Sequence, residues 1–136
     1  TDLHGIHDPE GESIFTARAM IAMAARANNV IPIDTVHIKV HDLDDLENNL
    51  KLAKKLGFEG MLILHPKELD LAHKYFSPDE QEIKDANEMI RLNEEALINN
   101  QGVAIMNGKF IGPPMVLAAR KTIEKAELIK NKKSSN

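Results

Sequence analysis

The segments Val30-Ile31-Pro32-Ile33-Asp34 and Gly60-Met61-Leu62-Ile63-Leu64-His65-Pro66 decide the fold of this chain. Each is a short apolar run that ends abruptly at a polar residue, which is typical of a buried strand followed by a loop. We therefore expect strands at residues 30–33 and 60–64. Proline inside the first run makes a central place in a sheet less favourable for it, because proline has no amide proton to donate.

An amphipathic pattern separates the two runs. Gly57 follows it at the place where a helix commonly ends in a left-handed glycine. The apolar positions at helical spacing are Leu43, Leu46, Leu50 and Ala53. Strand, helix and strand in this order predict an α/β fold with parallel pairing through a crossover helix.

Further helices flank this unit. Residues 13–29 are rich in alanine and methionine, and we expect a helix there that is covered on most sides. Residues 67–76 are expected to be helical again. Ser77-Pro78-Asp79-Glu80 predicts a helix start with Ser77 as the capping residue and Glu80 completing a capping box, and this helix runs to about Asn99.

A β-hairpin is predicted near the end of the chain. Asn107-Gly108 joins the runs 103–106 and 109–111, and this dipeptide tolerates the two positive φ angles of a type I′ turn. A last helix follows Pro114. Its apolar stripe comprises Val116, Ala119, Ile123 and Ala126.

These elements predict three parts. Residues 1–76 form strand and helix units, residues 77–130 form a helix–hairpin–helix extension, and residues 131–136 form a lysine-rich, disordered tail. The sequence lacks an initiator Met and a secretory signal, so we expect it to begin partway through a longer protein.

Composition excludes several classes of protein. With 17 Lys and Arg against 21 Asp and Glu, the net charge is -4, and no basic stripe is available for nucleic acid. The most apolar stretch, residues 17–27, is too short and too charged to cross a membrane. The absence of cysteine excludes disulfides, thiolate zinc sites and a cysteine nucleophile, and it fits a cytoplasmic protein.

Asp34 and His65 are the candidate site residues, because each directly follows a predicted strand. The carboxyl ends of parallel strands lie at one edge of the sheet, where ligands bind. Asp34 could instead cap a turn, and His65 could hydrogen-bond a loop backbone. Neither His37 with His41 nor His4 with His7 has a spacing that predicts a zinc site.

Four segments in this order resemble the citrate lyase beta subunit family, which includes malyl-CoA and citramalyl-CoA lyases. The resemblance covers nearly the whole chain. The segments are Phe15-Thr16-Ala17-Arg18, Ile31-Pro32-Ile33-Asp34-Thr35-Val36, residues 55–60 running into Leu64-His65-Pro66, and Phe76-Ser77-Pro78 with residues 108–114. It implies the C-terminal portion of a TIM (β/α)8 barrel followed by the helix–hairpin–helix extension.

The resemblance also implies an activity. The family comprises Mg²⁺-dependent carbon–carbon lyases that act on hydroxyacyl-CoA thioesters such as citryl-CoA or malyl-CoA. Ile33, Asp34, His65 and Pro66 are then expected to contact the acyl-CoA. The magnesium ligands of the family are expected upstream of this chain, since Asp2-Leu3 resembles the end of the loop that follows one of them. A homo-oligomer, a trimer or hexamer, is implied as well, and no catalytic residue is assigned.

One departure from the family favours an alternative. Gly112 stands where members often carry an aspartate after the hairpin, and glycine cannot transfer a proton. Two predicted strands also cannot close an eight-stranded barrel, which needs about 250 residues. The alternative is a truncated or non-catalytic relative that serves as an assembly or ligand-binding module. An open, doubly wound fold is less favoured, because the sequence has no glycine-rich phosphate loop.

Overall fold

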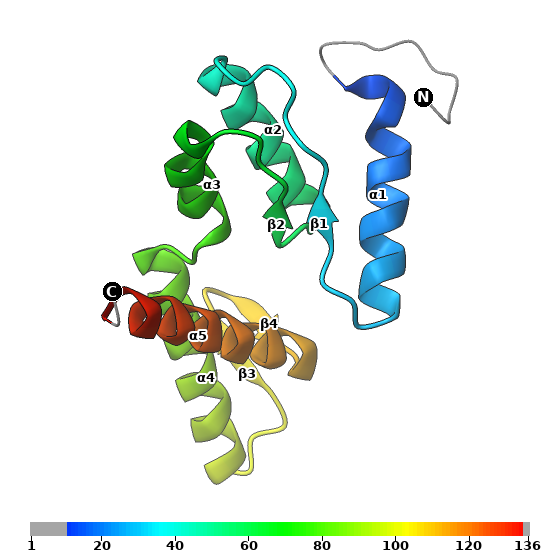
Figure 1. Cartoon of the computed structure of the whole chain (residues 1–136). Helices are drawn as coiled ribbons and strands as arrows, with labels where there is room; N and C mark the ends of the chain where they lie inside the picture. Colours follow the sequence, from blue (N-terminus) through cyan, green and yellow to red (C-terminus); the bar gives the residue numbers. More distant parts are fainter. Residues whose placement is uncertain (1–10, 135–136) are drawn as a thin grey trace. The chain divides into compact units, whose positions relative to one another are not determined.

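Two short parallel strands, β1 (Ile33–Asp34) and β2 (Gly60–Met61), lie side by side in the computed structural model (Figure 1). Ile33 pairs with Gly60 and Asp34 with Met61, so the predicted parallel pairing is confirmed. The strands are shorter than the predicted runs 30–33 and 60–64. Beyond the two paired positions, one backbone hydrogen bond on each side continues the pairing of the two strands. The amide of Glu59 donates to the Pro32 carbonyl at 2.9 Å, and the amide of Leu62 donates to the Asp34 carbonyl at 3.1 Å.

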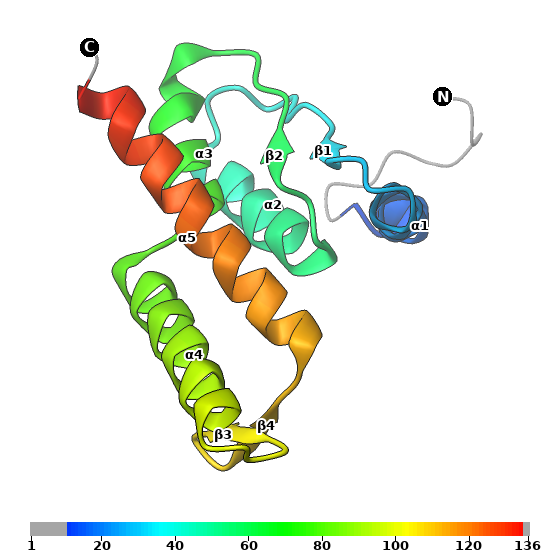
Figure 2. The same cartoon turned by 90° about the horizontal axis from the view of Figure 1, so that it is seen from below.

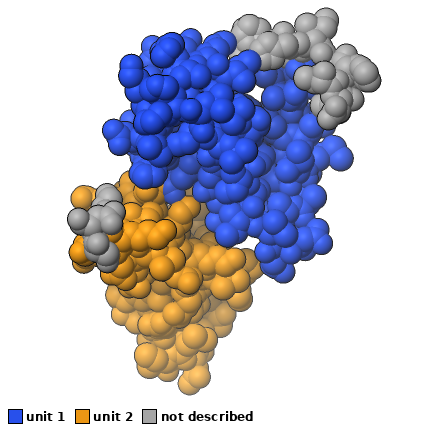
Figure 3. Space-filling model, in the orientation of Figure 1, with its two compact units in different colours: residues 1–76 blue, residues 77–136 orange. Residues whose placement is uncertain are grey.

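The structure describes residues 11–134, without the side chain of residue 133. The chain divides into two compact units, residues 1–76 and residues 77–136, which we call unit 1 and unit 2 (Figure 3). Three of the predictions fall outside the described residues. They concern the resemblance at Asp2-Leu3, the histidines at positions 4 and 7, and the last two residues of the predicted tail. Among residues 11–134, no helix is long and apolar enough to cross a membrane.

Unit 1 contains the predicted helices with small changes of boundary. They are α1 (Glu12–Ala27), α2 (Leu43–Leu56), a short 3₁₀ helix η1 (Pro66–Glu68) and α3 (Leu69–Phe76). The crossover helix α2 begins at Asp42, whose side chain accepts the amide of Asp45 at 3.0 Å. It ends at Gly57 with a φ of 93°, as the C-cap pattern predicts.

The core of unit 1 centres on α2. Leu46 and Leu50 pack with Ala72 of α3, while Ala53 packs with Ala22 of α1 and with Phe58. Burying each of the two leucines contributes about 1.5–3 kcal/mol. Leu46, Leu50 and Ala53 of the predicted apolar stripe therefore form the buried face of this helix, whereas Leu43 at its start is exposed.

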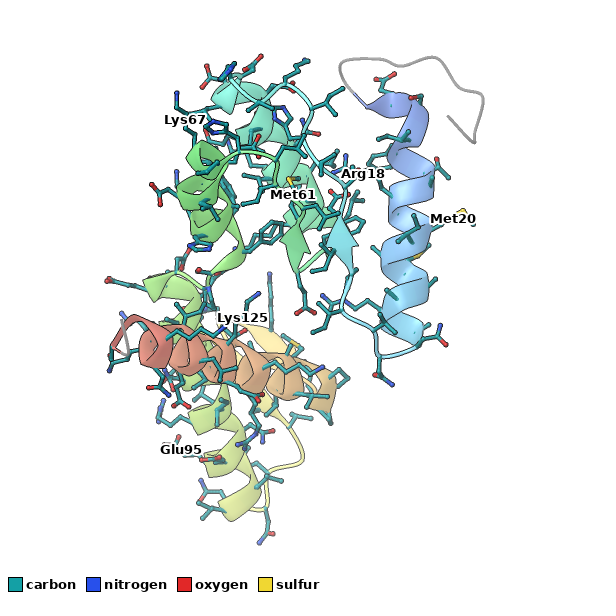
Figure 4. All side chains as sticks on the ribbon, in the orientation of Figure 1. Arg18, Met20, Met61, Lys67, Glu95 and Lys125 are labelled. Atoms are coloured by element: carbon teal, nitrogen blue, oxygen red, sulfur yellow. The ribbon has the colours of Figure 1, made fainter. Side chains whose placement is uncertain are left out.

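The expectation that α1 is covered on most sides is wrong. Its buried residues are Arg18 and Ala22, and Figure 4 shows Arg18 on the side that faces β1 and Met20 on the opposite side. The exposed apolar residues of the helix are Ile14, Phe15, Met20, Ile21 and Met23. Sequence composition suggested a buried helix, whereas only one face of α1 has packing partners among the described residues.

Unit 2 is built from α4 (Glu80–Ile98), a hairpin of β3 (Ala104–Met106) and β4 (Lys109–Ile111), and α5 (Pro113–Ser134). Figure 2 shows the hairpin at the C-terminal end of α4. The core of the unit joins all of these elements through Ala96, Ala104, Ile111 and Val116. Ala119 is buried as well, and Ile123 and Ala126 are half-buried, which agrees with the predicted stripe.

The predicted hairpin is present, with its first strand beginning at Ala104 and not at Val103. Ile105 pairs with Phe110 and Met106 with Lys109, which leaves Asn107 and Gly108 as the two-residue loop. Their φ angles are 50° and 73°, the two positive values that a type I′ turn needs.

The start of α4 differs from the prediction. Asp79, not Ser77, is the capping residue, and its side chain accepts the amide of Glu82 at 2.7 Å. Glu82 returns the bond by accepting the amide of Asp79 at 3.0 Å. This register leaves Pro78 outside the helix, where its missing amide proton costs nothing.

The end of α5 also differs. The helix continues to Ser134, so residues 131–134 are helical where a disordered tail was expected. Lysines in the last turns favour this extension, because positive charge stabilises a helix C-terminus. Ser134 Oγ further donates to the carbonyl of Lys130 at 3.1 Å.

Replacing Asp79 tests the corrected cap. D79A should lower the free energy of unfolding by about 1 kcal/mol, because it removes the acceptor for the Glu82 amide. S77A is the matched control and should leave stability within about 0.5 kcal/mol of the wild type. Urea unfolding followed by circular dichroism measures both, and a larger loss in S77A than in D79A would restore Ser77 as the cap.

Tyr75 offers a second test, since it is the single tyrosine of the chain and tryptophan is absent. Its hydroxyl donates to the Glu47 carboxylate, and this bond raises the pKa of Tyr75 to about 12. Titration of the near-ultraviolet tyrosinate absorbance should show that value in the wild type, and E47Q should return the midpoint to about 10. Glu88→Gln in unit 2 is the control, and equal midpoints in E47Q and the wild type would contradict the contact.

Candidate functional site

The carboxyl ends of β1 and β2 bring two loops together. Residues 35–42 follow β1, and residues 62–65 follow β2. At the pair Ile33–Gly60, a Cβ on residue 60 would lie 2.9 Å from Ile33 Cδ1, so the end of the Ile33 side chain would have to shift for any larger residue.

Asp34 is buried in a bidentate ion pair with Arg18 of α1. Its Oδ2 accepts from Arg18 Nη2 at 2.5 Å, and its Oδ1 accepts from Arg18 Nε at 3.3 Å and from the Thr35 amide at 2.9 Å. The two side chains are only 2% and 7% exposed. Both carboxylate oxygens are thus engaged within the protein, so Asp34 acts on the site by anchoring the start of the loop after β1.

His65 caps η1, the 3₁₀ helix that begins at Pro66. Its Nδ1 accepts the amide of Lys67 at 3.1 Å, so the neutral ring carries its proton on Nε2. The backbone role weighed from the sequence is therefore present. It also fixes the tautomer and leaves an N–H donor on the other side of the ring.

His41 brings the loop after β1 to His65. The two imidazole rings meet edge to face, with centroids 6.0 Å apart. His41 also lines an open hollow of about 690 Å³, whose wall comprises Lys39, Val40, His41, Asp42, Leu43 and Asp44. Two basic rings beside a hollow lined by Lys39 can meet an anionic or carbonyl-bearing ligand.

A buried polar cluster lies beneath these loops, and the sequence reading missed it. His37 Nε2 bonds Asp45 Oδ2 at 2.8 Å, and His37 Nδ1 lies 3.7 Å from Glu68 Oε1. The hydrogen bond from His37 and the nearby Lys39 hold the pKa of Asp45 below its usual value, although partial burial opposes them. One signal was available in the sequence, since Glu68 lies three residues after His65, which is the spacing of a capping box.

Glu68 holds the loop after β2. This residue is fully buried, and its Oε2 accepts the amides of Leu64 at 3.0 Å and His65 at 3.3 Å. The carboxylate therefore satisfies the two backbone donors just before η1 and orients His65.

The predicted site residues come together only in part. Ile33 and Asp34 are adjacent in β1, but Ile33 is half exposed while Asp34 is buried. His65 and Pro66 lie in the loop after β2, beside His41. Among the described residues, no cluster of three His, Asp or Glu side chains could hold a metal ion, so these residues do not fit a magnesium site.

The parallel strands and their crossover helix define the class as α/β, in which ligands commonly bind at the carboxyl ends of the strands. Comparison with known proteins narrows the class. The family model described as HpcH/HpaI aldolase/citrate lyase matches residues 1–66. Residues 1–66 of the chain are thus similar to the HpcH/HpaI aldolase/citrate lyase family.

Two relatives illustrate the similarity. The chain is 32% identical over 126 residues to the citrate lyase subunit beta of Leuconostoc mesenteroides, which covers 93% of this chain and 42% of that protein. It is 35% identical over 121 residues to the (3S)-malyl-CoA thioesterase of Cereibacter sphaeroides, which covers 89% of this chain and 42% of that protein. The chain thus spans less than half the length of these relatives.

Solved structures share the fold. CitE from Mycobacterium tuberculosis, in complex with magnesium, acetoacetate and coenzyme A, matches with a TM-score of 0.66 at 21% identity, over 82% of this chain and 40% of that one. A citrate lyase from Burkholderia xenovorans matches with a TM-score of 0.69 at 20% identity, over 85% of this chain and 35% of that one.

The ion pair of Arg18 and Asp34 predicts a large stability effect. D34N should lower the free energy of unfolding by about 3–5 kcal/mol, because it leaves the Arg18 charge buried without its partner. The double variant R18M/D34N should recover most of the loss, since no buried charge remains.

Denaturant unfolding of the single and double variants measures this coupling. A D34N variant as stable as the wild type would contradict the anchoring role, and Asp34 would then be a group held for a ligand.

Proposed function

We propose that this chain forms the C-terminal portion of a (β/α)8 barrel, with a helix–hairpin–helix extension, in a carbon–carbon lyase that acts on a hydroxyacyl-CoA thioester. Citryl-CoA and malyl-CoA are the proposed substrates. The observation that carries the proposal is the parallel pair β1–β2, whose carboxyl ends present the loop after Asp34 beside His65. Relatives named citrate lyase subunit beta and malyl-CoA thioesterase support the thioester substrate class.

The reaction defines what the site has to do. The hydroxyl group of the substrate loses its proton and becomes a carbonyl, while the bond to the carbon α to the thioester breaks. The electron pair of that bond passes to the thioester as an enolate, which then takes up a proton. Hydrogen-bond donors fixed beside the thioester oxygen stabilise this charge as it develops.

His65 is the donor that we propose for this purpose. Its Nε2–H is set by the bond from Lys67 to Nδ1, and Glu68 holds its backbone. Pro66, which begins η1, and the half-exposed Ile33 are proposed to contact the acyl-CoA beside it. Asp34 is a positioning residue, because it acts through Arg18 and the Thr35 amide.

Magnesium would polarise the substrate oxygens when bound. The described residues do not supply its ligands, so we propose that these belong to other parts of the complete protein. A homo-oligomer, as a trimer or hexamer, and a cytoplasmic location also stay predictions.

A second candidate function is a non-catalytic assembly or ligand-binding module. Gly112 favours it, because glycine has no carboxylate with which to transfer a proton. A Cβ there would lie 3.0 Å from Cε1 of the exposed Phe110 ring, so an aspartate would need a small shift of that ring.

Substitution of His65 in the native polypeptide tests the lyase proposal. H65N keeps an acceptor for the Lys67 amide but loses the Nε2–H donor, whereas H65A loses both. Both variants should lower kcat/KM at least about tenfold with the thioester that the wild type cleaves. His73→Ala on α3 is the matched control and should leave the rate unchanged.

Citryl-CoA, malyl-CoA and citramalyl-CoA are assayed with added magnesium. Absence of turnover of all three by the wild type, together with measurable acyl-CoA binding, would reject the lyase and support the ligand-binding module. Wild-type rates in H65N would remove His65 from the reaction.

A further inference from the structure

The cluster of Asp45, His37 and Glu68 contains two buried polar atoms that face each other without a hydrogen bond. They are His37 Nδ1 and Glu68 Oε1, 3.7 Å apart. His37 is 6% exposed and Glu68 is fully buried. An unpaired buried polar atom costs about 1–3 kcal/mol, so two in contact require an explanation.

The surrounding bonds determine where protons lie. Asp45 Oδ2 accepts from His37 Nε2 at 2.8 Å and lies 3.3 Å from Lys39 Nζ, and these contacts keep Asp45 ionised. His37 must therefore carry a proton on Nε2. Glu68 Oε2 already accepts the amides of Leu64 and His65, so Oε1 is its remaining oxygen.

A neutral His37 beside an ionised Glu68 would place two lone pairs against each other. Nδ1 of such a ring is a bare acceptor, and Oε1 of a carboxylate is an acceptor as well. The separation is also too short for a water molecule in line between them. One additional proton resolves the conflict, because it converts the contact into a charge-assisted hydrogen bond after a movement of less than about 1 Å.

We propose that His37 Nδ1 and Glu68 Oε1 share a proton at neutral pH, and that this proton clamps together the loops after β1 and β2. His37 belongs to the first loop, and Glu68 holds the amides of the second. Loss of the proton leaves the Asp45 and Glu68 carboxylates on either side of a neutral ring, and the clamp opens. The inference concerns the folded chain itself and does not depend on the proposed lyase activity.

The clamp makes stability fall as pH rises. Free histidine is mostly neutral above about pH 6.5, so the unfolded chain lacks the proton that the folded cluster keeps. Unfolding then releases one proton, and the unfolding equilibrium constant should rise as the pH rises above about 7, by at most about tenfold per pH unit. The charged groups that set this balance are Asp45, Lys39 and Glu68.

Glu68→Gln separates the proton from the loop contacts. Its side-chain oxygen can still accept the amides of Leu64 and His65, and its NH₂ group can donate to Nδ1 of a neutral His37. E68Q should therefore fold and lose the pH slope. Glu59→Gln is the matched control in unit 1, since Glu59 pairs with Arg26 outside the cluster, and it should keep the slope.

Nuclear magnetic resonance of the full 136-residue chain tests the proton directly. With labelled histidine and glutamate at about pH 7.5, where free histidine is neutral, either a protonated Nδ1 of His37 or a protonated Glu68 carboxyl supports the proposal. A bare Nδ1 together with an ionised Glu68 overturns it. A wild-type pH slope that E68Q leaves unchanged overturns it as well.

Discussion

The buried ion pair between Arg18 and Asp34 is the interaction on which the arrangement of unit 1 depends. It joins the middle of α1 to the last residue of β1, and the same carboxylate also holds the Thr35 amide. A charge this deeply buried is costly unless its partner is in place, so the pair tolerates only one position of the helix against the strand. The loop after β1 starts from that fixed point.

The loop after β2 is fixed by a different device. Glu68 reaches back from η1 to the amides of Leu64 and His65, and the His65 ring accepts the Lys67 amide. These reciprocal bonds set both the backbone and the ring of His65. The side chains at the strand ends thus owe their geometry to polar networks within unit 1.

Local patterns predicted the elements that local physics controls. Asn107-Gly108 predicted the hairpin because its two positive φ angles depend on those two residues alone. The predicted capping residue of α4 was wrong because two overlapping pairs have the spacing of a capping box. These pairs are Ser77 with Glu80 and Asp79 with Glu82. Choosing between overlapping signals depends on where the helix packs, which a short pattern does not contain.

The sequence did not predict which side chains are buried. Asp34 was correctly placed at a strand end, but its engagement by Arg18 follows from tertiary packing. His37 looked like a loop histidine, and only the fold brings it between Asp45 and Glu68. The methionines of α1 looked like core residues for the opposite reason, because composition does not say whether a neighbour covers them.

Many apolar residues of unit 1 are exposed, which helps to explain why their burial differs from what the sequence predicted. Val30, Ile31, Leu62 and Leu64 are each more than half exposed, although parallel strands are normally covered on both faces. Relatives more than twice as long have the chain to cover such surfaces with further strands and helices. The polar contacts of Asp34 and His65 need no such neighbours, because each is completed within unit 1. A site at the strand ends can therefore keep its local geometry whether or not further strands and helices cover the apolar faces around it.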